Sequence, residues 1–84
     1  MGNDRERIGK RISRLRMEAG ISQYKLADLT GISQGNIARI ESGKYSTGID
    51  LLSKIGDALG YELDFVRHDT GDNHSNPNLI PSRL

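Results

Sequence analysis

The chain has 84 residues, of which 35% are hydrophobic and 27% are charged, and it contains no cysteine. This length has room for one small domain, and the lack of cysteine excludes a disulfide framework and a cysteine-ligated zinc site. No run of 18 apolar residues and no signal-peptide pattern occurs, so we expect a cytoplasmic protein without a membrane span.

Charge is divided unevenly along the chain. The formal net charge is only +1, but residues 1–45 hold nine Lys and Arg against five Asp and Glu, whereas residues 46–84 hold three against six. A basic half indicates a surface for binding a polyanion, although charged residues also simply keep a protein surface hydrated.

The first helix is predicted to begin at Asn3 or Asp4, either of which can cap it, and to stop at Gly20. Its apolar positions, four and three residues apart, are Ile8, Ile12 and Leu15. Ile21 then follows Gly20 as the apolar residue of a Schellman ending does.

Two short helices follow. Ser22 can cap a second helix, which Gly31 ends, and Ser33 can cap a third helix, which Gly43 ends. The apolar residues of the two helices are Leu26, Ala27, Leu29, Ile37 and Ile40. A fourth helix is predicted from Ile49 to the stop at Gly60.

Beyond the fourth helix the apolar period changes from that of a helix to two residues. Tyr61, Leu63 and Phe65 alternate with Glu62 and Asp64. This pattern predicts a strand over residues 61–67. Because a lone strand leaves its backbone groups unpaired, we expect it to pair with the same strand of a second chain, with Tyr61, Leu63 and Phe65 in the dimer interface. The alternative is a short fifth helix packed on the core of the same chain.

The remaining residues, 68–84, are rich in polar residues and are predicted to form a flexible tail. Residues of a possible metal cluster occur there, namely His68, Asp69, Asp72 and His74. They lack a rigid scaffold, so we expect no metal and no cofactor. A glycosylation acceptor pattern, Asn73-His74-Ser75, also occurs, but nothing directs this chain to a secretory pathway.

Residues 23–42 carry the most specific pattern in the chain. Small and apolar residues fall where two helices must meet: Leu26, Ala27, Gly31, Ile32, Ile37 and Ile40. The combination of ISQYKLADLTGIS with NIARIESGK resembles the Cro and phage-repressor (XRE-like) type of helix-turn-helix DNA-binding domain. The resemblance runs from Ile8 to about Gly60. It implies a mainly α, compact lambda-repressor-like domain of four to five helices, which we place at residues 1–67.

The resemblance also assigns roles by position, because in this family the second helix of the motif enters the major groove of DNA. It implies base contacts from Ser33, Gln34, Gly35, Asn36 and Arg39, and backbone contacts from Gln23, Tyr24, Lys25 and Lys44. It further implies a structural ion pair between Arg16 and Glu41. Side-chain chemistry agrees, since Gln and Asn can pair with adenine and Arg with guanine.

Two residues depart from the family. Gly35 stands where a longer polar side chain is common, and a glycine inside a helix costs about 1 kcal/mol relative to alanine. It either lets the helix sit deeper in the groove, or leaves a base pair unread, or only relieves a local clash. Thr30 takes a place that is usually apolar, and its methyl group is expected to pack.

The sequence therefore predicts sequence-specific binding to double-stranded DNA by a dimeric transcriptional repressor that reads an inverted-repeat operator. An enzyme is not expected, because no catalytic grouping has a rigid scaffold. One alternative is an antitoxin whose tail holds a toxin protein, with Leu79, Ile80 and Leu84 as apolar anchors. Another is an interaction adaptor that does not bind DNA, although the polar face of Gln34, Asn36 and Arg39 argues against it.

Overall fold

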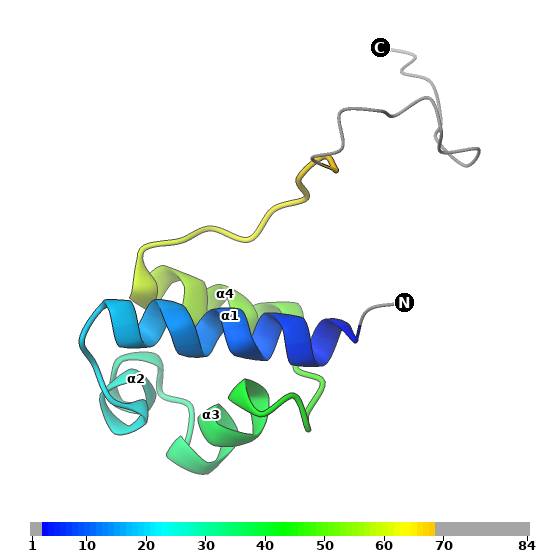
Figure 1. The fold of residues 1–84 in the computed structure, drawn as a ribbon. Coiled ribbons are helices and arrows are strands. Elements are labelled where there is room, and N and C mark those ends of the chain that lie inside the picture. The colour runs from blue at the N-terminus through cyan, green and yellow to red at the C-terminus, as the bar shows by residue number, and fades with distance from the viewer. Residues whose placement is uncertain (1–2, 69–84) are drawn as a thin grey trace.

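The computed structural model describes residues 3–68, which form four packed helices followed by an extended segment (Figure 1). The helices are α1 (Asp4–Glu18), α2 (Gln23–Thr30), α3 (Gln34–Glu41) and α4 (Ile49–Leu59). α1 packs against α3 and α4, and α2 packs against the same two helices. The predicted mainly helical, four-helix domain is thus confirmed.

The helices begin and end at the predicted residues because local hydrogen bonds set each boundary. Asn3 caps α1 by accepting from the backbone N–H groups of Arg5 and Glu6. The hydroxyl oxygens of Ser22 and Ser33 accept from backbone N–H groups in the first turns of α2 and α3, at 3.0 and 3.2 Å. The predicted stops at Gly20, Gly31, Gly43 and Gly60 all have positive φ. These left-handed residues close each helix and turn the chain into the next segment.

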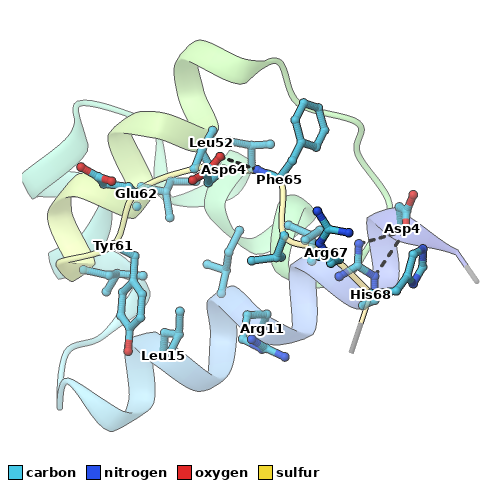
Figure 2. A pocket seen from close by; sticks show the side chains of 18 residues that line it. Asp4, Arg11, Leu15, Leu52, Tyr61, Glu62, Asp64, Phe65, Arg67 and His68 are labelled. Carbon is cyan, nitrogen blue, oxygen red and sulfur yellow. Dashed lines mark hydrogen bonds and ion pairs between the residues drawn. The ribbon is translucent and has the colours of Figure 1, made fainter. Parts of the chain in front are cut away.

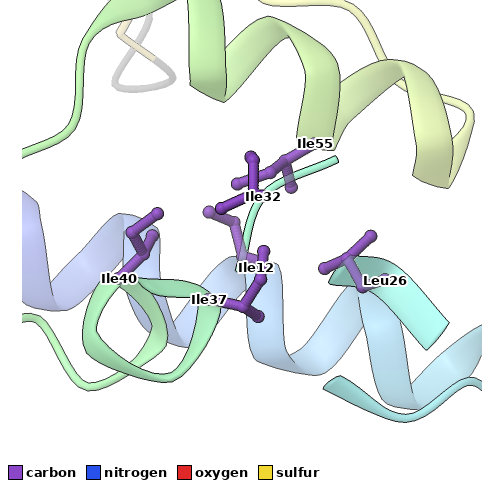
Figure 3. Close-up of a cluster of buried hydrophobic side chains, with 6 residues drawn as sticks. All are labelled: Ile12, Leu26, Ile32, Ile37, Ile40 and Ile55. Atoms are coloured by element: carbon purple, nitrogen blue, oxygen red, sulfur yellow. The ribbon is translucent and has the colours of Figure 1, made fainter. Parts of the chain in front are cut away.

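The core is a small cluster of aliphatic side chains to which every helix contributes (Figure 3). Its buried members are Ile12, Leu26, Ile32, Ile37, Ile40 and Ile55. Thr30 is also buried, and its hydroxyl donates to the Leu26 carbonyl oxygen at 2.8 Å and accepts from the Ile32 N–H at 3.2 Å. The hydrogen bonds of this hydroxyl therefore offset the cost of removing it from water. Leu29 is 52% exposed, so the apolar stripe of α2 is narrower than its sequence pattern indicates.

Gly9 lies where α1 crosses α3. A Cβ atom at Gly9 would meet the backbone carbonyl oxygens of Ile40 and Glu41, with only 2.7 Å to the second of them. No side-chain rotation can relieve a contact with backbone, so the two helices pack this closely only because Gly9 has no side chain.

In the single chain residues 61–68 do not form the fifth helix considered as an alternative, and the strand predicted over residues 61–67, which requires a second chain as its partner, stays a prediction. Residues 61–68 have neither helical nor strand hydrogen bonding. The Tyr61 N–H donates to the Gly56 carbonyl oxygen at 2.7 Å, which closes the end of α4, and the Phe65 N–H donates to the carboxylate of Asp64. A strand requires a ladder partner, and no other strand exists within residues 3–68 to provide one.

The greater part of the predicted tail, residues 69–84, lies outside the described residues. The metal-cluster candidates Asp69, Asp72 and His74, the Asn73-His74-Ser75 pattern and the anchors Leu79, Ile80 and Leu84 therefore lie outside them too. Among residues 3–68, no group of three His, Asp or Glu side chains is placed to hold a metal ion. No helix in the same range is both long enough and apolar enough to cross a membrane.

Candidate nucleic-acid interface

α2 and α3 lie together on one side of the molecule and form a helix-turn-helix (Figure 1). The turn between them contains Gly31, whose φ of 75° allows the reversal of the chain. α3 buries Ile37 and Ile40 in the core, whereas Gly35 and Arg39 on its other side are exposed. One face of α3 is therefore anchored and its polar face is accessible to a partner.

A chain of side-chain hydrogen bonds fixes the beginning of α3. The Gln34 amide donates through Nε2 to Oε1 of Gln23 at 2.9 Å, and Gln23 donates through its own Nε2 to Oε1 of Glu41 at 3.0 Å. The first residue of α3 is thus tied to the first residue of α2 and, through it, to the last residue of α3. This arrangement orients Gln34 before any partner binds.

This series of hydrogen bonds ends at a nearly buried ion pair between α1 and α3. Arg16 donates through Nε to Oε2 of Glu41 at 2.7 Å and through Nη2 to Oε1 at 3.0 Å, and its Nη1 donates to the Ile21 carbonyl oxygen at 2.9 Å. The side chains of Arg16 and Glu41 are only 13% and 6% exposed. This bidentate geometry suits a guanidinium and a carboxylate that are removed from water.

Competing effects set the charge of Glu41. Burial alone would raise the pKa of Glu41, but hydrogen bonds from Arg16 and Gln23 and the positive charge of Arg16 outweigh burial and bring this pKa below its usual range. The hydrogen bond to Glu41 in turn raises the pKa of Arg16. Because the pKa of Glu41 is lower in the folded state, the pair stabilises the fold above the carboxyl's unfolded pKa. That stability is lost as the pH falls through the folded pKa.

Gln34 keeps hydrogen-bonding capacity for a partner after its bond to Gln23. A primary amide has two N–H groups and one carbonyl oxygen, and the bond to Gln23 uses only one N–H. The remaining N–H and oxygen are the pair that reads adenine in the major groove. Asn36, half-buried two residues later, carries the same amide chemistry.

Gly35 is not required to avoid a steric clash within the described residues. A Cβ atom built at Gly35 has no heavy atom within 4 Å, and its φ is not in the left-handed region. Relief of a local clash is therefore not the reason for this glycine. Its bare backbone lies on the exposed side of the first turn of α3.

Arg39 is held by a residue that sequence reasoning did not single out. The Arg39 guanidinium carbon lies 5.4 Å from the ring centroid of Tyr45, within the range of a cation–π interaction. The backbone N–H of Lys44 donates to the Arg39 carbonyl oxygen at 3.1 Å, which brings the chain back beside α3. The only sequence signal for Tyr45 was an aromatic residue in the loop that follows α3.

The other predicted contact residues surround α3. Tyr24 and Lys25 are exposed in the first turn of α2, and Lys44 is exposed just beyond the end of α3. Gln23 differs from them, because its side chain bridges Gln34 and Glu41 inside the protein. The residues predicted for the dimer interface, Tyr61, Leu63 and Phe65, lie on a different segment after α4.

Comparison with known proteins identifies related sequences. A helix-turn-helix family model, HTH_3, matches residues 12–66. The chain is 32% identical over 63 residues to the SPbeta prophage-derived HTH-type transcriptional regulator YonR of Bacillus subtilis, covering 75% of this chain and 58% of YonR. It is 38% identical over 55 residues to the HTH-type transcriptional regulator PuuR of Escherichia coli, covering 66% of this chain but 30% of PuuR. The chain therefore spans only part of these relatives.

Solved structures share the fold. The restriction-modification controller protein C.AhdI from Aeromonas hydrophila superimposes with a TM-score of 0.68 at 30% identity, covering 70% of this chain and 89% of that one. The clp gene regulator ClgR from Corynebacterium glutamicum superimposes with a TM-score of 0.68 at 27% identity, covering 70% of this chain and 76% of that one. Both comparisons agree with the four-helix arrangement.

Proposed function

Because this chain belongs to the HTH_3 helix-turn-helix family, which matches residues 12–66, we propose that it is a transcriptional regulator that binds specific sequences of double-stranded DNA. In this proposal α3 enters the major groove, and Ser33, Gln34, Gly35, Asn36 and Arg39 face the base edges. The observation that carries the proposal is the hydrogen-bonded chain from Gln34 to the Arg16–Glu41 pair. It fixes an adenine-reading amide at the start of α3 and so reduces the entropy lost on binding.

The residues that flank α3 supply the contacts to phosphate in this proposal. Lys25 and Tyr24 approach one strand from the first turn of α2, which contains no acidic residue and has its positive helix end there. Lys44 approaches the backbone from the other end of α3. Gln23 acts as a positioning residue for Gln34 and contributes to the same edge of the surface.

The proposal gives Gly35 a role on DNA. Since nothing in the described chain crowds a Cβ atom there, we assign the lack of a side chain to contact with DNA. A bare backbone at this place lets the first turn of α3 approach the floor of the groove or a thymine methyl group.

We further propose that two copies bind together and read an inverted repeat. Two α3 helices related by a two-fold axis would contact half-sites about 34 Å apart, one turn of DNA, or a multiple of that spacing. Such a regulator represses by occupying its operator, and it would act in the cytoplasm where that DNA lies. The apolar residues Tyr61, Leu63 and Phe65 are the proposed contacts between the copies.

The two kinds of DNA contact predict different effects of mutation. Arg39→Ala should lose about 1 to 3 kcal/mol of discrimination at one position of each half-site, because it removes a base contact. Lys44→Ala should weaken binding to all sequences alike and lower the dependence of log Kd on log salt by about one, because it removes a phosphate contact. Binding of both variants to a panel of single-base operator variants at two salt concentrations measures the difference. An equal loss on every sequence for both variants would contradict the assigned roles.

A further inference from the structure

The extended segment after α4 leaves apolar side chains in water. Phe65 is 100% exposed and Val66 is 89% exposed, while Tyr61 and Leu63 are about half exposed at 52% and 46%. Exposed apolar residues are common singly, but four within six residues of one segment form a patch that indicates a binding surface.

A groove lies beside this segment. It is a cavity of about 810 Å³ between α1, α4 and residues 61–68, which we call the α1–α4 groove. Its apolar walls are Ile8, Ile12 and Leu15 of α1 with Leu52, Ile55 and Leu59 of α4. Figure 2 shows the segment running alongside these two helices with the Phe65 ring turned away from them. The chain's own residues 61–68 thus form one side of the groove without filling it.

We infer that the α1–α4 groove receives residues 61–66 of a second copy of this chain, and that the exchange is reciprocal. The docking differs from the pairing of two strands, because it is made by side chains that enter a groove between helices. This inference rests on the proposed function, which supplies the two-fold axis. Under that symmetry each copy offers one segment and one groove to the other.

The chemistry of the two surfaces is complementary. Glu62 and Asp64 alternate with Tyr61, Leu63 and Phe65, so an extended chain carries these three apolar groups on one side and its acids, together with Val66, on the other. The α1 side of the groove carries Arg11 next to its apolar wall, and Arg7, which pairs with Asp4 at 3.1 Å. A segment of this pattern places apolar groups on the floor and carboxylates beside the arginines, which fixes its direction and register.

The size of the two surfaces also favours a second copy. A Phe or Tyr side chain covers roughly 150 to 250 Å². Two segments and two groove walls together bury on the order of 1,000 to 2,000 Å², which is the range of stable interfaces. No residue of α2 or α3 lines the groove, so its occupation leaves the proposed DNA surface uncovered.

Single-cysteine variants test this docking directly, because the natural chain contains no cysteine. Val66→Cys and Arg11→Cys chains, prepared separately and mixed, should form a cross-linked pair with a short bis-maleimide reagent, detected by mass. Val66→Cys mixed with Asp28→Cys is the control, since Asp28 is exposed on α2 and does not line the groove. Absence of the mixed product, together with cross-linking inside one chain by the Arg11→Cys, Val66→Cys double variant, would overturn the proposal in favour of the chain's own segment.

Sedimentation equilibrium provides the second readout. Phe65→Ser should raise the dimer dissociation constant at least tenfold without changing the far-UV spectrum, because Phe65 is fully exposed in the single chain. Met17→Ser, a substitution of another exposed apolar residue at 62% exposure that lies outside the groove, should leave the constant unchanged. Equal constants for both variants, or a wild-type chain that stays monomeric at about 100 µM, well above typical micromolar affinities, would overturn the proposal. Binding of the monomer to a duplex with a single half-site then shows whether the DNA-reading role still stands.

Discussion

Replacing Glu41 with alanine is expected to lower the free energy of unfolding by about 3 to 5 kcal/mol. The variant leaves the guanidinium of Arg16, only 13% exposed, without its partner in the interior. It also removes the oxygen that accepts from Gln23 and so releases the hydrogen-bonded chain that orients Gln34. For a domain of this size such a loss is a large part of the total stability.

Urea unfolding followed by circular dichroism at pH 7 measures this loss, with Glu18→Ala as the matched control. Glu18 pairs with Arg14 on the surface at 4.0 Å, and both side chains are more than half exposed, so its removal should cost no more than about 0.5 kcal/mol. The difference in free energy of unfolding between wild type and the Glu41→Ala variant should shrink as the pH falls through the folded pKa of Glu41. Equal losses for the two variants would contradict a structural role for the inner pair.

Replacing Gly9 with alanine is expected to lower the free energy of unfolding by about 3 kcal/mol, although alanine favours a helix by about 1 kcal/mol over glycine. The added methyl group would collide with the carbonyl oxygens of Ile40 and Glu41, which belong to the backbone of α3. Since backbone cannot rotate aside, α1 and α3 must separate, and the contacts of Ile12 and Ile37 in the core weaken with them.

Gly35→Ala is the matched control, because it makes the same change in another helix where a Cβ atom meets nothing within 4 Å. It should raise the free energy of unfolding by about 0.5 to 1 kcal/mol, measured by the same urea titrations. We expect the free energy of unfolding to change in opposite directions in the two variants. A Gly9→Ala protein as stable as wild type would show that the close approach of the two helices is not required.

Local interactions explain why the helix boundaries could be predicted. Ser22 and Ser33 cap their helices through a bond to an N–H three residues away, and the stops at Gly31 and Gly60 depend on the backbone freedom of one residue. Features that depend on distant parts of the chain were not predictable in the same way. Gly9 is required by carbonyl groups more than 30 residues away, and no pattern in its own helix indicates that contact.

The predicted strand depends on a partner outside the chain for a related reason. The alternating residues 61–67 specify an extended chain, but a strand also needs a ladder partner, which the rest of the described chain does not offer. In the candidate site, the roles of Gln34, Asn36 and Arg39 come from the resemblance to the family and stay predictions. The bridging position of Gln23 and the ring of Tyr45 beneath Arg39 depend on side-chain conformations that a sequence does not display.

Selection of tight binders from random duplex DNA, with the full chain at about 0.15 M salt and the retained pool sequenced, tests the central claim most directly. A regulator that reads DNA through α3 in a two-fold dimer should enrich an inverted repeat with half-site centres about 10 base pairs apart, or a multiple of that spacing. Adenines at conserved places in each half-site would correspond to Gln34 and Asn36. A retained pool with no enriched sequence would contradict the claim that this chain reads DNA.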